Sequence, residues 1–157
     1  MIFMYALEHI PLALLSEYLD YAASNNNLQF MSLEEHNDWL NQVQTSDQCY
    51  LIRFYDSAKD KNIMFYVVKQ YKDKLNWKLC TSVVTEKFSV SLYKSMKQAL
   101  YLFVQYIKEN GGTNLIVYIH DRNRWILNIG RTTLGSPIKD IADNNSIREI
   151  VWCVNDV

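Results

Sequence analysis

Four polar residues cluster where an apolar stretch gives way to a turn: His120, Asp121, Arg122 and Arg124. An imidazole beside a carboxylate and two guanidinium groups can act as a general base close to a phosphate. The same residue types also make a soluble hairpin tip, because turns at the surface are rich in polar side chains. The cluster therefore supports a small enzyme centred on His120 only as an alternative function.

Residues 129–140 form a loop that combines glycine with hydroxyl side chains, a second candidate for binding phosphate. Phosphate contacts could come from its polar side chains: Arg131, Thr132, Thr133 and Ser136. Its spacing matches neither a Walker loop nor the G-x-G-x-x-G pattern of dinucleotide sites. A turn that ends at Pro137 explains the segment without a ligand.

Cysteine and histidine spacing indicates neither a metal site nor a nucleophile. The three cysteines are far apart and form no C-x-x-C pair: Cys49, Cys80 and Cys153. His9 and His36 lack the H-E-x-x-H spacing, and each cysteine lies in an apolar strand pattern where a buried thiol is the commoner role. We expect reduced thiols, no catalytic residues, no metal and no cofactor.

Charge is distributed unevenly along the 157 residues. Residues 1–52 contain 7 acidic residues and no Lys or Arg, whereas residues 53–157 contain 16 basic residues against 10 acidic ones. Part of the acidic excess has a local cause, because Glu34 and Glu35 lie in the first turn of a predicted helix, where carboxylates are favoured. A surface of one sign also suits a partner of opposite charge, since complementary fields speed encounter.

A partner surface is our first interpretation of the acidic region, because aromatic residues that could anchor an interface lie beside its carboxylates. The predicted partner-binding residues are Glu17, Asp20, Tyr21, Glu34, Glu35, Asp38 and Trp39. By functional analogy, we expect a small inhibitor that neutralises a basic, nucleic-acid-acting protein, as immunity proteins neutralise nuclease toxins or phage proteins inhibit defence nucleases. The alternative is that these side chains only solvate two helices.

A basic, aromatic face supports a second alternative, a nucleic-acid-binding protein. Lysines interleaved with aromatic rings could neutralise a phosphate backbone and stack on bases. The residues of this face are Lys69, Lys72, Lys74, Trp77, Lys78, Lys94, Lys97 and Tyr101. The overall pI of about 6.3 and the excess of Lys over Arg count against it.

Hydrophobic periodicity predicts the elements that would position these residues. A period near 3.6 predicts helices over 11–24, 33–44 and 94–109, the second with a capping box at Ser32 and Glu35. Alternation with period two predicts a meander of strands at 48–56, 62–71, 76–83 and 86–92. Two more strands are expected at "NLIVYIH" and "WILNIG", and a last one at 148–154, where a helix also fits.

The expected fold is a single α+β domain over residues 1–157, with an acidic helical part at 1–47 and a sheet with one long central helix at 48–157. The sheet is expected to be antiparallel, with a four-stranded meander, a later hairpin and a C-terminal strand. No apolar run approaches about 18 residues and no signal peptide is recognisable, so we expect a cytoplasmic protein without membrane contact.

Overall fold

The computed structural model of the chain describes residues 1–7, 17, 34, 38 and 49–157. Most of both predicted N-terminal helices, 11–24 and 33–44, lies outside the described residues. Glu17, Glu34 and Asp38 are described and are helical. The division into one domain with an acidic helical part stays a prediction.

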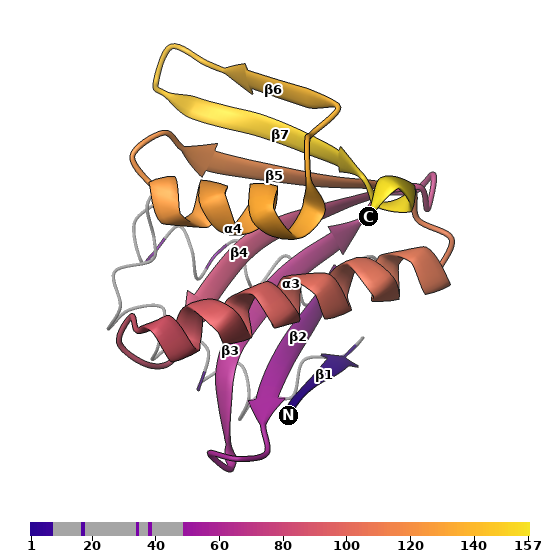
Figure 1. Ribbon diagram of the computed structural model, residues 1–157. Helices are drawn as coiled ribbons and strands as arrows, with labels where there is room; N and C mark the ends of the chain where they lie inside the picture. The colour runs from indigo at the N-terminus through magenta and orange to yellow at the C-terminus, as the bar shows by residue number, and fades with distance from the viewer. Residues whose placement is uncertain (8–16, 18–33, 35–37, 39–48) are drawn as a thin grey trace.

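A seven-stranded mixed sheet forms the centre of the described part (Figure 1). Its strands are β1 (Ile2–Leu7), β2 (Cys49–Asp56), β3 (Lys61–Gln70), β4 (Asn76–Val84), β5 (Asn114–His120), β6 (Lys139–Ala142) and β7 (Ile147–Cys153). The spatial order is β1-β2-β3-β4-β5-β7-β6. Neighbouring strands are antiparallel except β4 and β5, which are parallel and are joined by a helical crossover, as parallel pairing requires.

Helix α3 (Val90–Glu109) is this crossover, and both of its ends follow from local sequence. The Ser89 side chain accepts the Leu92 backbone N–H at 3.0 Å, which caps the N-terminus. At the other end Gly111 has φ +77°, and the N–H of Gly112 bonds the carbonyl of Ile107 at 2.9 Å. This is the Schellman ending that glycine permits after a helix.

Helices α3 and α4 (Arg124–Leu134) lie on the same face of the sheet in Figure 1. The buried face of α3 carries Met96, Leu100, Phe103 and Ile107, as the sequence predicted. The core packs between these helices and the sheet, where the central strand β3 is buried continuously from Ile63 to Val68. A short 3-10 helix, η1 (Val154–Asp156), follows β7.

The predicted fold class is wrong, although several elements were placed correctly. The strands at 48–56, 62–71 and 76–83 correspond to β2, β3 and β4, and the strand alternative for 148–154 is confirmed as β7. Residues 86–92 are not a strand but the loop and first turn of α3, because Ser89 caps a helix there. "WILNIG" is part of α4, so the expected hairpin is absent and the sheet is mixed. Strand β1 was not predicted.

In the described residues, no helix is long and apolar enough to cross a membrane.

Candidate functional site

Strands β4 and β5 pair over only part of their length. Their parallel pairing runs from Asn76 opposite Asn114 to Leu79 opposite Val117, while β4 continues to Val84 and β5 to His120. A bulge in the β3–β4 ladder falls beside the last pair, where Thr81 pairs with Val67 and Leu79 with Val68. Bulges bend and twist a strand locally. The two strands therefore diverge beyond Leu79, toward the end of the sheet at which α4 begins (Figure 1).

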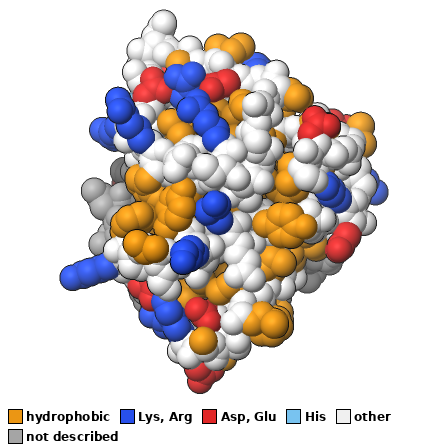
Figure 2. Space-filling view, in the orientation of Figure 1, with side chains coloured by type: hydrophobic (Ala, Val, Ile, Leu, Met, Phe, Trp, Pro, Cys, Tyr) orange, Lys and Arg blue, Asp and Glu red, His pale blue; other side chains and the backbone are white. Residues whose placement is uncertain are grey.

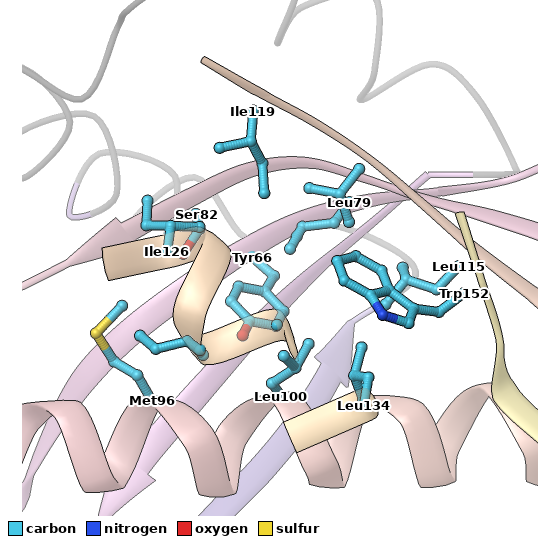
Figure 3. A pocket seen from close by; sticks show the side chains of 13 residues that line it. Tyr66, Leu79, Ser82, Met96, Leu100, Leu115, Ile119, Ile126, Leu134 and Trp152 are labelled. Carbon is cyan, nitrogen blue, oxygen red and sulfur yellow. The ribbon is translucent and has the colours of Figure 1, made fainter. Parts of the chain in front are cut away.

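An apolar cavity of about 60 Å³ lies where the strands part, between the sheet, α3 and α4 (Figure 3). Its lining includes residues from four strands and both helices: Tyr66, Leu79, Ser82, Met96, Leu100, Leu115, Val117, Ile119, Ile126, Ile129, Gly130, Leu134 and Trp152. Gly130 allows α4 to approach β7, since a Cβ there would lie 2.9 Å from Cη2 of Trp152. The Trp152 indole N–H donates to the Gly135 carbonyl at 3.0 Å, which fixes the wall of the cavity.

Tyr66 is the buried polar side chain of this cavity. It is 4% exposed and its ring contacts Phe54 and Phe103, with centroids 4.7 and 5.5 Å away. Its hydroxyl makes no hydrogen bond with the described residues, and Figure 3 shows it pointing toward α3, near Leu100. Burial raises the pKa of Tyr66 well above its ordinary value, so the hydroxyl stays protonated and can donate a hydrogen bond.

Aromatic side chains lie where the β4–α3 loop meets the start of α4. The Phe88 ring lies 5.5 Å from Trp125 and 6.5 Å from Tyr93, both edge-on. Asn128 of α4 donates to the Tyr93 hydroxyl at 2.8 Å and so ties the two helices together. Phe88 and Val90 are mainly exposed, and Figure 2 shows hydrophobic side chains interspersed with Lys and Arg on this side of the molecule.

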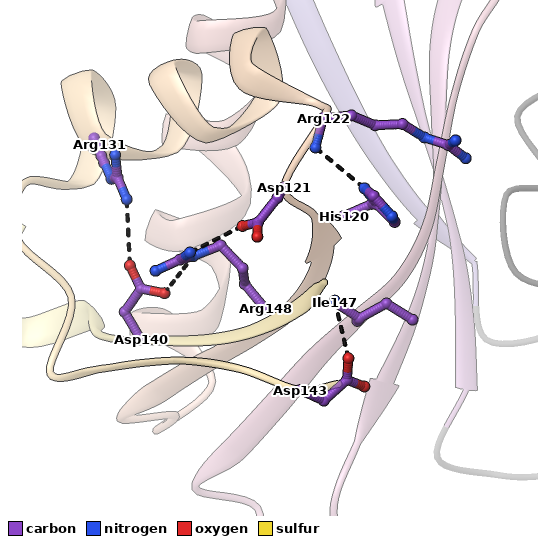
Figure 4. Close-up of polar contacts among 8 residues, drawn as sticks. All are labelled: His120, Asp121, Arg122, Arg131, Asp140, Asp143, Ile147 and Arg148. Carbon is purple, nitrogen blue, oxygen red and sulfur yellow. Dashed lines mark hydrogen bonds and ion pairs between the residues drawn. The ribbon is translucent and has the colours of Figure 1, made fainter. Parts of the chain in front are cut away.

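An ionic network joins the turn after β5 to β6 and α4 (Figure 4). Arg148 of β7 donates to Asp121 at 2.9 Å and to Asp140 at 2.8 Å, and Arg131 of α4 donates to Asp140 at 3.2 Å. Arg148 first and Arg131 second hold the pKa of Asp140 below its ordinary value. The network fixes the position of α4 over the cavity.

The turn after β5 also determines which nitrogen of the His120 ring can accept a proton. Its Nδ1 accepts the backbone N–H of Arg122 at 3.1 Å (Figure 4). The neutral ring must then carry its proton on Nε2, where it is a donor and not a base. Asp121 is engaged by Arg148. Two residues of the predicted catalytic cluster, His120 and Asp121, therefore have structural partners, and the arrangement does not support a general base at His120.

The predicted partner surface can be placed only in part. Glu34 and Asp38 are exposed, and Glu17 is half-buried with its carboxylate 3.5 Å from the Asn62 side-chain nitrogen. The other predicted residues lie outside the described residues: Asp20, Tyr21, Glu35 and Trp39. Their grouping on one surface, and a basic partner such as a nuclease toxin, stay predictions. In the described residues, no cluster of side chains fits a metal ion.

One residue of the predicted nucleic-acid face is buried, and the function of the others stays a prediction. Trp77 is 1% exposed, so it cannot stack on a base. Lys72 and Lys74 lie on the β3–β4 turn, which bonds the chain just after α3 through Leu75 and Thr113. The residues of this face on α3 lie in its N-terminal twelve residues: Lys94, Lys97 and Tyr101. Lys69 and Lys78 instead lie over the Tyr71 and Tyr118 rings.

Sequence reasoning missed the residues that form the cavity. The strand prediction for 62–71 includes Tyr66 without giving it a role. Gly130 falls at the end of the predicted strand "WILNIG" and in the predicted loop 129–140, and neither prediction indicates that it packs in the core. A hydroxyl-bearing residue inside the apolar run "IMFYVV" was the one signal available.

Comparison with known proteins gives no relative by sequence: no family model matches the chain, and no curated protein matches it. Solved structures match its fold. A spermidine N-acetyltransferase from Vibrio cholerae, in complex with CoA and spermine, superposes with a TM-score of 0.73 over 99% of this chain and 96% of its own, at 8% identity. This is the GNAT acetyltransferase fold.

Two further GNAT structures agree. An N-acetyltransferase from Staphylococcus aureus Mu50 has a TM-score of 0.67 and 15% identity, and covers 99% of both chains. The ribosomal-protein-S18-alanine N-acetyltransferase from Escherichia coli has a TM-score of 0.66 and 12% identity, over 96% of this chain and 91% of its own. At these identities the similarity establishes the fold.

These matches overturn the expectation of an inhibitor. The three solved structures named above are N-acetyltransferases, whereas we expected an immunity-protein-like inhibitor of a toxin or nuclease. That expectation rested on charge and on aromatic residues near it, and both describe a surface without specifying the fold beneath it.

Proposed function

We propose that this protein is an acyltransferase that moves an acyl group from an acyl-CoA thioester to an amine. The observation that carries the proposal is the parting of β4 and β5 above a cavity that contains the Tyr66 hydroxyl. Polar main-chain groups normally pair within a sheet, so a strand edge released from its neighbour can bond a ligand. The matched Vibrio cholerae structure, which contains CoA, supports the same assignment.

The described residues fit the thioester arm of CoA better than its phosphate groups. Beyond Leu79 and Val117 the two strands no longer pair with each other, and the gap has an apolar floor, which suits a narrow arm of mixed polarity. The N-terminus of α3 has no acidic residue in its first turn and Lys87 lies just before it, which suits phosphate. Residues 85–89 contain no glycine, so their side chains limit close approach of that loop to a phosphate.

When bound, an acyl-CoA supplies an activated acyl carbon: its C–S bond breaks, a C–N bond to the amine forms, the amine releases a proton to solvent and the sulfur takes one up, giving an amide and a free thiol. Tyr66 can donate a hydrogen bond into the cavity, because a tyrosine hydroxyl is protonated at neutral pH and burial raises its pKa further. Met96, Leu100 and Ile129 exclude water around that hydroxyl. The Phe88–Trp125 pair joins the β4–α3 loop to the start of α4.

The test is acyl transfer by the purified full-length chain. Acetyl-CoA is incubated with either spermine or a peptide with an N-terminal alanine, and mass spectrometry detects an acceptor heavier by one acetyl group. Tyr66→Phe should lower the rate at least tenfold, whereas the matched change Tyr101→Phe, on an exposed part of α3, should not alter it. If the chain neither binds acetyl-CoA by calorimetry nor acetylates an acceptor, the proposal is wrong.

We also propose a cytoplasmic location. Its support is that the three cysteines form no disulfide, since free thiols persist in reducing compartments.

A further inference from the structure

We propose that the cavity beneath α4 selects an acyl chain of about four carbons rather than an acetyl group. This rests on the proposed function, and it concerns the space beyond the point at which β4 and β5 part. Leu79 and Val117 form the last pair of the two strands, yet Leu115, Leu134 and Trp152 also line the cavity. Leu115 lies two residues back within the paired region. The cavity therefore continues under the closed part of the sheet.

The part of the cavity under the paired strands can hold an acyl chain. A thioester arm held along β4 beyond Leu79 would direct its acyl group toward the closed end, because in the other direction β4 and β5 no longer pair. Figure 3 shows Leu115, Trp152 and Leu134 together at one end of the cavity, and Met96, Ser82 and Ile126 at the other. The first group is the predicted site of the acyl tail.

The volume sets the length of the chain. A water molecule needs about 10 to 15 Å³ measured in this way. The whole cavity of about 60 Å³ therefore has room for roughly four to six water-sized groups, which is more than the carbonyl and methyl groups of an acetyl donor fill. Water is a poor occupant, since it needs two to four polar partners. Among the lining side chains only Tyr66, Ser82 and the Trp152 indole are polar, and the indole N–H is engaged by Gly135.

Tyr66 is the second, independent indication that this space receives a ligand. Its side chain is more than nine-tenths buried, and its hydroxyl faces the cavity without a partner in the described residues. Packing alone would be served by phenylalanine, which fills the same space without a hydroxyl group to remove from water. An acyl group brings a carbonyl oxygen that can accept this hydrogen bond.

Calorimetric titration of the full-length protein with acetyl-, butyryl- and decanoyl-CoA tests the inference without relying on turnover. Each additional buried methylene strengthens binding about fourfold, so butyryl-CoA should bind roughly fifteenfold more tightly than acetyl-CoA. Decanoyl-CoA should lose this gain because its chain exceeds the cavity. Leu134→Phe should bring butyryl-CoA to the level of acetyl-CoA, and Leu100→Phe provides a second filling variant if the first does not fold.

Gln98→Phe, which adds a ring at an exposed position of α3, is the matched control and should keep the butyryl preference. Equal affinities for acetyl- and butyryl-CoA would overturn the chain-length inference and leave the proposed function standing. A butyryl preference that survives both filling variants would place the acyl tail elsewhere and also overturn it. Absence of binding by all three thioesters would overturn the proposed function and this inference together.

Discussion

Leu100 and Phe103 fix α3 to the sheet through side chains that are 7% and 0% exposed. Replacing Leu100 with Ala should lower the free energy of unfolding by about 2–5 kcal/mol, and replacing Phe103 by about 3–5 kcal/mol, because each change leaves a cavity. Chemical denaturation measures both. Tyr101→Ala, on the exposed side of the same helix, should cost less than about 0.5 kcal/mol. Equal effects at all three positions would contradict this assignment of the buried face.

At this scale the sequence predicted packing better than chemistry. The buried positions of α3 follow from their spacing, because a helix of period 3.6 places Met96, Leu100 and Phe103 on one face whatever surrounds it. The role of Tyr66 depends on what faces it across the core, namely two helices and β7. No local pattern encodes that neighbourhood, so the cavity could not be predicted.

The elements themselves show why the fold was only partly predictable. Strands β2 to β4 follow one another through short turns, so neighbours in sequence are neighbours in the sheet. Parallel pairing of β4 with β5 depends on how α3, which connects them in sequence, packs on the face of the sheet. That packing is a tertiary property. In α4, "WILNIG" has apolar residues that suit either period, and the helix is selected by packing of Gly130 on Trp152.

Arg148 is expected to stabilise the arrangement of β5, β6 and α4 in a way that depends on pH. Its hydrogen bond, with that of Arg131, lowers the folded-state pKa of Asp140 below the ordinary 3.8. A carboxyl group with a lowered pKa contributes stability that is present above its unfolded pKa and is lost as the pH falls through its folded pKa. Arg148→Ala should therefore lower the melting temperature at pH 7, and its difference from wild type should shrink below about pH 3.8.

Thermal melts between pH 2 and pH 7 measure this difference. Lys94→Ala removes one positive charge from an exposed position of α3 and should give a difference of similar size across the same range. A constant deficit of Arg148→Ala at every pH would show that its alkyl chain, and not its ion pairs, stabilises the fold.

For the whole molecule, the described sheet consists of two parts joined along four residue pairs. Strands β1 to β4 form one part and β5 to β7 the other, and they meet only at Asn76–Leu79 and Asn114–Val117 in the described residues. The sequence could not indicate this junction, because its two strands are separated by all of α3. The proposed acyl-donor site lies at this junction, so its integrity bears directly on function.

Gly112 offers a test of the junction. A Cβ at this position would lie 2.4 Å from Cγ2 of Ile107 and 2.6 Å from Nε1 of Trp77, and Trp77 pairs with Leu115 across the junction. Gly112→Ala should therefore destabilise the protein by about 1–3 kcal/mol through overpacking. Its matched control is Gly111→Ala, where a Cβ meets nothing within 4 Å and only the positive φ is unfavourable, at about 1–2 kcal/mol. The two variants thus lose similar stability for different reasons.

Amide hydrogen exchange separates the two variants. Gly112→Ala should speed exchange selectively along Asn76–Leu79 and Asn114–Val117, because a displaced indole loosens those pairs, whereas Gly111→Ala should not. Uniform acceleration over all strands in both variants would show that the two parts of the sheet open only together, as a single cooperative unit.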